Sequence, residues 1–142
     1  MTKKILIVDD ELAKFPQDWF VRLQEWGEVI DSQAATKVSD ARRLIAQYQE
    51  ADIILLDGSF GDGDCNAVIS AVPQANRQKV YGFSSEADAW WGDLWPKGVR
   101  HFPGKDMERL KACFAGECEC HFGPSCEVEM RRRHGIPLTD YR

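Results

Sequence analysis

Three short apolar runs, each followed at once by a charged or hydroxyl side chain, most strongly constrain what this chain can fold into. The runs and the residues that follow them are Lys4–Val8 with Asp9, Asp10 and Glu11, Ile53–Leu56 with Asp57, and Val80–Phe83 with Ser84. Branched apolar runs of this length are typical of strands buried on both faces of a parallel sheet. Because the carboxyl ends of parallel strands meet at one edge, we expect these polar side chains to converge.

Helical patterns separate the apolar runs. Residues 15–26 place large apolar side chains on one helical face, and Ser39 is expected to cap a helix that carries Ala41 and Leu44 inward. Further helices are expected over residues 66–72, 86–95 and 106–115, with additional strands at Glu28–Asp31 and Gly98–Phe102. This alternation predicts an α/β fold whose open parallel sheet is covered by helices on both faces.

Length and charge narrow the class of protein. The chain has 142 residues and a formal net charge of −5, which fits one domain and makes nucleic acid an unlikely partner. The one basic cluster, residues 131–134, is more often a solvated stretch than a phosphate-binding element. No apolar run is long enough for a membrane span, and the apolar run near the N-terminus is too short for a signal peptide. We therefore expect a cytoplasmic protein without a membrane partner.

The polar residues at the strand ends suggest phosphoryl chemistry. Carboxylates that converge repel one another unless a cation lies among them, and Mg²⁺ is the hard cation that carboxylates and phosphate oxygens hold. Ser84 and Lys105 follow two further strands and offer a hydroxyl and an ammonium to phosphate oxygens. An aspartate in this setting is a plausible nucleophile for phosphoryl transfer.

Four segments together resemble the receiver domain of two-component response regulators. They are Ile5–Glu11, Asp52–Asp57, Phe83–Ser85 and Gly98–Lys105. The resemblance covers about residues 3–115 and implies a flavodoxin-like (βα)5 fold, with a doubly wound sheet of five parallel strands in the order 2-1-3-4-5. It divides the chain into a receiver domain, residues 1–115, and a C-terminal extension, residues 116–142.

The resemblance also implies roles for individual residues. Asp57 would accept a phosphoryl group from a histidine kinase or phosphotransfer protein, with self-phosphorylation from small donors and autodephosphorylation. Ser84 and Lys105 would contact phosphoryl oxygens, and Phe102 would be the aromatic switch residue. Asp10, Asp57 and the backbone carbonyl of Ser59 would bind Mg²⁺ directly, and Asp9 would contribute through water.

Two positions depart from the family pattern. Gly61 and Asp106 stand where the family usually has proline, and Asp106 is placed to draw Lys105 away from a phosphate. The alternative function is therefore a pseudo-receiver, a protein-interaction module that phosphorylation does not switch. Acids at strand ends also serve as helix caps, and a buried Phe102 also fits a purely structural role.

The helix predicted over residues 86–95 and the C-terminal extension suggest where partners bind. Trp90, Trp91 and Trp95 lie on or beside one predicted helix, so they either form a face for a downstream protein or a homodimer, or cover the sheet. The extension is too short for a DNA-binding or enzymatic output domain, so output is expected through protein contact. Its Cys118, Cys120, His121 and Cys126 offer a zinc ligand set, although their spacing is not that of ordinary zinc modules.

Overall fold

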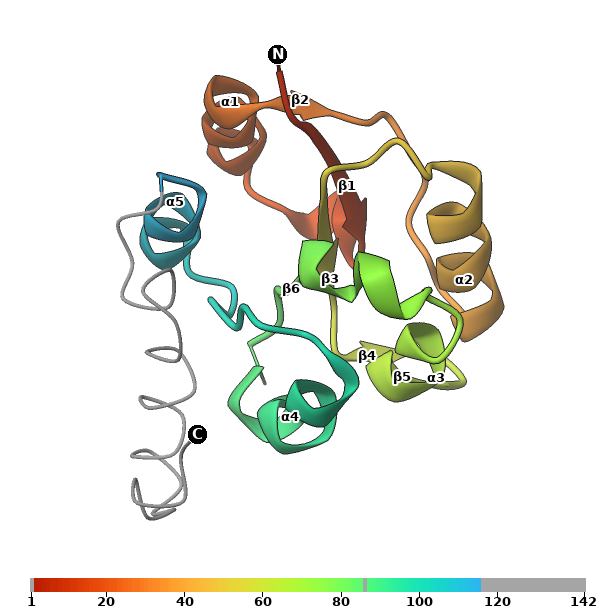
Figure 1. Ribbon diagram of the computed structural model, residues 1–142. Coiled ribbons are helices and arrows are strands. Elements are labelled where there is room, and N and C mark those ends of the chain that lie inside the picture. Colours follow the sequence, from red (N-terminus) through yellow and green to blue (C-terminus); the bar gives the residue numbers. More distant parts are fainter. Residues whose placement is uncertain (1, 86, 116–142) are drawn as a thin grey trace, which may run out of the picture.

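A parallel sheet forms the centre of the computed structural model, which describes residues 2–85 and 87–115 (Figure 1). The sheet has four strands in the order β2-β1-β3-β6. Their bounds are β1 Lys4–Val8, β2 Glu28–Val29, β3 Ile53–Leu56 and β6 Val80–Gly82. The three apolar runs of the sequence therefore form β1, β3 and β6, as predicted, and the fold is of the flavodoxin-like α/β class.

The position of the fifth strand is reduced to a single parallel bridge between Tyr81 and His101. Gly82 donates its N–H to the carbonyl of His101 over 2.8 Å, but the pairing goes no further as a ladder. The strand expected over Gly98–Phe102 is therefore wrong in length. Gly98 adopts a left-handed φ of 107°, and Pro103 has no N–H to donate, so both ends of the segment are kept out of a regular strand.

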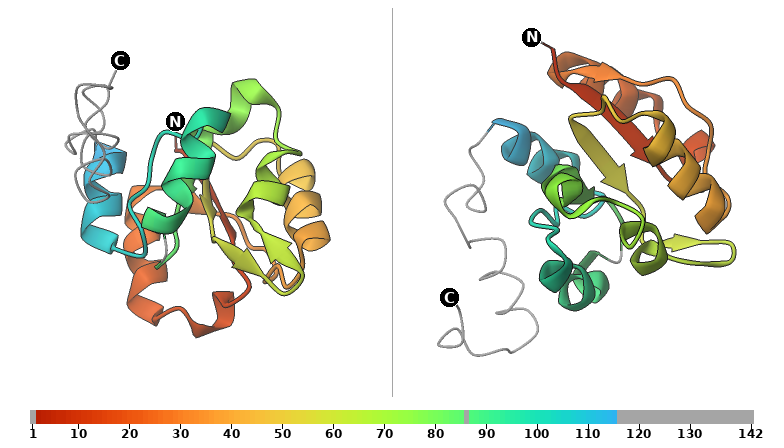
Figure 2. Two further views of the ribbon diagram at one scale, coloured as in Figure 1. Left: turned by 90° about the horizontal axis from the view of Figure 1, so that it is seen from below. Right: turned by 45° about the vertical axis from the view of Figure 1, so that its right-hand side comes forward.

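Helices cover both faces of the sheet. The α-helices are α1 Gln17–Trp26, α2 Val38–Gln47, α3 Cys65–Ile69, α4 Ala87–Leu94 and α5 Met107–Ala115, and the 3₁₀ helices are η1 Leu12–Lys14, η2 Gln74–Lys79 and η3 Trp95–Lys97. Figure 2 shows α1 and α5 on one side of the sheet and α2 and α3 on the other. None of the helices in the described ranges is both long enough and apolar enough to span a membrane.

Side-chain alternation along β1 divides the core into two clusters. Leu6 and Val8 pack with the residues of α2 and α3, whereas Ile5 and Ile7 pack with those of α1 and α5. Successive side chains of a strand point to opposite faces, so a continuous apolar run serves both layers. This double burial is the reason why β3, and β1 after its first residue Lys4, contain only apolar side chains.

A small hairpin follows β3. Strands β4 (Ser59–Phe60) and β5 (Gly63–Asp64) pair antiparallel, and the Asp62 carboxylate accepts the N–H of Val38 over 2.8 Å. Helix α2 thus begins at Val38, and Ser39 is not its cap. The acceptor comes from a residue 24 positions away, a long-range contact that no local capping pattern contains.

Candidate functional site

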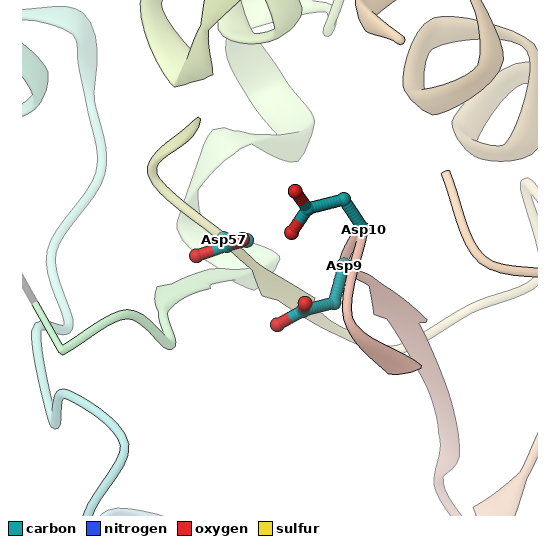
Figure 3. A group of neighbouring side chains, drawn as sticks. All are labelled: Asp9, Asp10 and Asp57. Atoms are coloured by element: carbon teal, nitrogen blue, oxygen red, sulfur yellow. The ribbon is translucent and has the colours of Figure 1, made fainter. Parts of the chain in front are cut away.

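Three carboxyl groups meet at the carboxyl ends of β1 and β3. Val8 pairs with Leu56, so the residues that follow them, Asp9 and Asp57, leave the sheet side by side. One carboxylate oxygen from each of Asp9, Asp10 and Asp57 lies within 4.8 Å of the others. Figure 3 shows the Asp9 and Asp10 side chains at the end of β1, with their carboxyl groups pointing toward Asp57.

Backbone N–H groups hold two of these side chains in place. Asp9 Oδ1 accepts the N–H of Glu11 over 2.7 Å, and Asp57 Oδ1 accepts the N–H of Gly58 over 2.8 Å. Asp9 and Asp57 are 1% and 8% exposed, so water cannot compensate for their charges. The carboxyl groups of Asp9 and Asp57 are therefore fixed in orientation and almost inaccessible to solvent.

Burial raises the pKa of both carboxyl groups. The pKa of Asp57 is raised to about 7, first by burial, then by the charge of Asp9 and by a hydrogen bond with Asp10 that needs a proton. Burial also raises the pKa of Asp9, although the Glu11 N–H and the Lys105 ammonium oppose the shift. Without a cation among them, the carboxyl groups thus resist full ionisation at neutral pH.

The Lys105 ammonium enters the site from the chain that follows the His101 bridge. Its Nζ lies 3.1 Å from Asp9 Oδ2 in an ion pair, yet the geometry leaves that oxygen without a hydrogen-bond partner among the described residues. The Asp106 carboxylate does not compete for Lys105. It accepts the N–H groups of Glu108 and Arg109 and so caps helix α5.

The donor set fits a hard cation such as Mg²⁺. Three carboxylates converge. Within the described ranges the buried Asp9 Oδ2 has the Lys105 ammonium beside it but accepts no well-directed hydrogen bond, which leaves it able to accept a further ligand. Asp10, Asp57 and Asp9 are the side chains placed to hold such an ion or its water ligands. Ser59, the other expected contributor, begins β4 two residues after Asp57.

The Ser84 hydroxyl lies beside Gly58, the residue that follows Asp57. Ser84 is 5% exposed and follows Phe83, whose N–H bonds to the carbonyl of Leu56 at the end of β3. Its Oγ is 3.1 Å from the point that a Cβ on Gly58 would occupy. The hydroxyl of Ser84 and the ammonium of Lys105 therefore both lie in the neighbourhood of the Asp57 side chain.

Phe102 is fully buried and belongs to the cluster on the α2 side. Its Cδ1 is 3.1 Å from the point that a Cβ on Gly82 would occupy, so the ring packs directly on the backbone of β6. The ring is thus turned into the core in this structure. This position is compatible with both roles considered for Phe102, a structural side chain and a switch.

Trp90 and Trp95 in the α4 region are less exposed than the side chains of a free docking face would be. Trp90 and Trp95 are half-buried and pack on the core, and the Arg100 guanidinium lies 4.2 Å from the centroid of the Trp95 ring. The Trp91 side chain lies outside the part that the structure describes, as do the candidate zinc ligands Cys118, Cys120, His121 and Cys126.

Sequence reasoning did not anticipate that the Trp90 indole reaches Gly58, beside Asp57. The available signal was the glycine itself, because it leaves room for a large neighbour after the acid.

Comparison with known proteins supports the fold and not a family. No family model and no curated protein sequence matches the chain. Among solved structures, a two-component response regulator of the LuxR family from Aurantimonas sp. SI85-9A1 matches with a TM-score of 0.59 and 21% identity, over 95% of this chain and 99% of that one. This chain has the fold of response-regulator receivers.

Two further structures share this fold. A probable two-component system response regulator/GGDEF domain protein matches with a TM-score of 0.58 and 16% identity, over 84% of this chain and 50% of that one. A structure described as an adenylate cyclase from Rhodopirellula baltica matches with a TM-score of 0.56 and 16% identity, over 94% of this chain and 99% of that one. At these identities the likeness concerns the fold, so the chemistry has to be argued from the site.

Proposed function

We propose that this chain is a phospho-accepting receiver that takes a phosphoryl group on Asp57 from a histidine kinase or phosphotransfer protein. The observation that carries the proposal is the convergence of Asp9, Asp10 and Asp57 within 4.8 Å, with Lys105 paired to Asp9 at the same place. A purely structural acid cluster has no need of three carboxyl groups at the switch point of a parallel sheet. The fold shared with response regulators supports the same assignment.

In the proposed reaction, one carboxylate oxygen of Asp57 forms a bond to phosphorus as the bond between phosphorus and the donor breaks. The leaving group, an imidazole nitrogen or the carboxylate of a small acyl phosphate, keeps the electron pair of the broken bond. Asp57 must be ionised to attack, and Lys105 favours its charged form. Bound Mg²⁺, held by Asp10, Asp57, the Ser59 carbonyl and, through water, Asp9, would neutralise charge on the carboxylates and the phosphoryl oxygens.

Ser84 and Lys105 would contact the phosphoryl oxygens after transfer. Ser84 offers a hydroxyl beside Gly58, and the Lys105 ammonium would exchange part of its pairing with Asp9 for a phosphoryl oxygen. Loss of the phosphoryl group to water would return Asp57 to its free state. Output would pass to a downstream protein through the surface around α4, where Trp90 to Trp95 lie.

The proposal is tested by intact-mass spectrometry after incubation with acetyl phosphate and Mg²⁺. We expect one added phosphoryl group in the wild-type chain and none in Asp57→Asn, whereas Asp31→Asn, which alters an exposed acid, should behave as the wild type. If the wild-type chain gains no phosphoryl group with any acyl or phosphoramidate donor, the protein is a pseudo-receiver. In that case Asp57→Asn would leave partner binding unchanged.

A further inference from the structure

The indole of Trp90 carries a buried N–H group without a hydrogen-bond acceptor among the described residues. Trp90 belongs to α4 and packs against the core cluster on the α2 side, and its Nε1 is inaccessible to solvent. Within residues 2–85 and 87–115, no acceptor bonds to this N–H. Buried indole N–H groups normally have a partner, so this donor calls for an explanation.

The position of the indole supplies a second, independent observation. The point that a Cβ on Gly58 would occupy is 2.0 Å from Trp90 Nε1 and 2.6 Å from Trp90 Cδ1. The polar edge of the ring, and not its hydrocarbon edge, therefore rests on the residue that follows Asp57. Any side chain at position 58 would collide with it, so glycine is what allows this approach.

The same point is 3.1 Å from the Ser84 hydroxyl oxygen. The indole N–H and the Ser84 hydroxyl thus adjoin one place, beside the peptide unit that joins Asp57 to Gly58. The backbone N–H of Gly58 is already used by Asp57 Oδ1. A phosphoryl group attached to Asp57 would bring acceptor oxygens close to this place.

We propose that the Trp90 indole N–H is a hydrogen-bond donor to a phosphoryl oxygen on Asp57. The inference rests on the proposed function, because it needs a phosphoryl group at Asp57, and it adds a donor from α4 to those from Ser84 and Lys105. A phosphoryl group carries strong acceptor oxygens, and hydrogen bonds to charged acceptors are the strong ones. Since Trp90 is part of α4, the bond would couple occupation of Asp57 directly to the position of that helix.

The test follows the indole N–H resonances of the full chain by NMR, with ¹⁵N-labelled tryptophan. The chain has five tryptophans, and Trp90→Phe assigns the resonance of interest by its loss. On addition of Mg²⁺ and beryllium fluoride, a mimic of the phosphoryl group, we expect the Trp90 proton to shift downfield and to exchange more slowly with water. Trp95, which is half-buried under Arg100, is the internal control and should move less.

A kinetic measurement separates a donor from a space-filling ring. We expect Trp90→Phe to lower the rate of phosphorylation by acetyl phosphate roughly 10- to 100-fold, the range for one hydrogen bond to a charged group. Its Mg²⁺ affinity should stay that of the wild type, and Trp95→Phe should change neither quantity. If Trp90→Phe does not fold, single replacement of the other four tryptophans assigns the Trp90 resonance by elimination, and the titration of the wild-type chain decides.

The outcomes distinguish this inference from the proposed function. If the wild-type chain forms no adduct with either reagent, the proposed function and the inference both fail. If the adduct forms but the Trp90 resonance moves no more than that of Trp95, the inference alone is wrong. The inference alone is also wrong if Trp90→Phe is phosphorylated as fast as the wild type.

Discussion

At the scale of single residues, Asp57 makes stability depend on pH in an unusual direction. Its pKa is raised from 3.8 to about 7, so the folded state keeps a proton that the unfolded chain loses near pH 4. The stability that this proton contributes is complete below about pH 4 and is lost as pH rises toward 7. In metal-free protein we expect Asp57→Asn to raise the free energy of unfolding by about 1–4 kcal/mol at pH 8, and by less at pH 5.

Urea unfolding in the presence of EDTA at the two pH values checks this prediction. Asp31→Asn removes an equal charge from an exposed position and should change stability little at either pH. A destabilised Asp57→Asn at pH 8 would contradict the prediction, because it would mean that the ionised carboxylate stabilises the metal-free fold.

Lys105 allows a prediction in which two properties change in opposite directions. Its ammonium lies 3.1 Å from Asp9 Oδ2 and repels a divalent cation bound to the same carboxylates. We expect Lys105→Ala to bind Mg²⁺ severalfold more tightly, yet to be phosphorylated roughly 10- to 100-fold more slowly, because a charge that stabilises the transferred group is lost. Calorimetric titration with Mg²⁺ and the mass assay measure the two effects, with the exposed Lys111→Ala as the control. Weaker Mg²⁺ binding in Lys105→Ala would show that the lysine positions Asp9 and does not compete with the ion.

The sequence predicted which polar side chains follow the strands, but not the contacts that these side chains and their neighbours make with the helices. An acid or hydroxyl directly after a buried strand must emerge at the carboxyl edge of the sheet, so the meeting of Asp9 and Asp57 follows from strand order alone. The use of Asp106 as a helix cap and the contact of Trp90 with Gly58 depend on how α5 and α4 pack. Such contacts between distant segments leave no local pattern in the chain.

At the scale of elements, the packing of α4 on the loop after β3 can be tested with two glycines. A Cβ on Gly58 would lie 2.0 Å from Trp90 Nε1, whereas no described atom is within 4 Å of the corresponding point on Gly92, which is an exposed residue of α4 itself. We expect Gly58→Ala to destabilise the fold by about 1–3 kcal/mol through overpacking. Gly92→Ala should stabilise it by about 0.5–1 kcal/mol, as expected for alanine in place of glycine in a helix.

Urea unfolding gives both values, and tryptophan emission reports whether the indole moves. Displacement of Trp90 toward water should shift the emission of Gly58→Ala to longer wavelength, with no shift in Gly92→Ala. Equal stability of the two variants would mean that the indole does not rest on Gly58 in solution.

The same scale shows where element prediction from sequence is dependable in this chain. The inner strands β1 and β3 were predicted because burial on both faces demands an unbroken apolar run. The segment before Lys105 lies at the edge of the sheet and begins with Gly98 in a left-handed conformation. It pairs with β6 through a single bridge. The hairpin after Asp57 lies outside what hydrophobic periodicity can detect, because its strands have two residues each.

At the scale of the whole molecule, the fold is retained where sequence similarity is weak. Solved response regulators share the fold at 16–21% identity, while no family model matches the chain. The sheet requires apolar residues at certain positions and not particular ones, so many sequences satisfy it. The fold alone does not specify chemistry, so the proposed function depends on the polar residues at the strand ends.

The division of the chain into a receiver and an extension leads to the last prediction. The cluster on the α1 side includes Leu110 and Cys113 of α5, and the Phe114 ring packs edge-on against Trp26 and Tyr81. Within the part of the chain that the structure describes, α5 thus covers the core on the α1 side. We therefore expect a chain ending at Ala115 to unfold cooperatively, with a Tm within about 5 °C of the full chain, and to accept a phosphoryl group on Asp57 at a similar rate.

A second truncation makes this prediction sharper. A chain ending at Asp106 lacks α5 and removes those contacts, so it should not unfold cooperatively. Thermal unfolding, monitored by circular dichroism, and the mass assay compare the three chains. Metal analysis of the full chain and of the chain ending at Ala115 tests whether the cysteines after Ala115 bind zinc. If the chain ending at Ala115 fails to fold while the full chain folds, residues 116–142 belong to the domain. The boundary inferred from the resemblance would then be wrong, since the residues up to Ala115 would not suffice for stability.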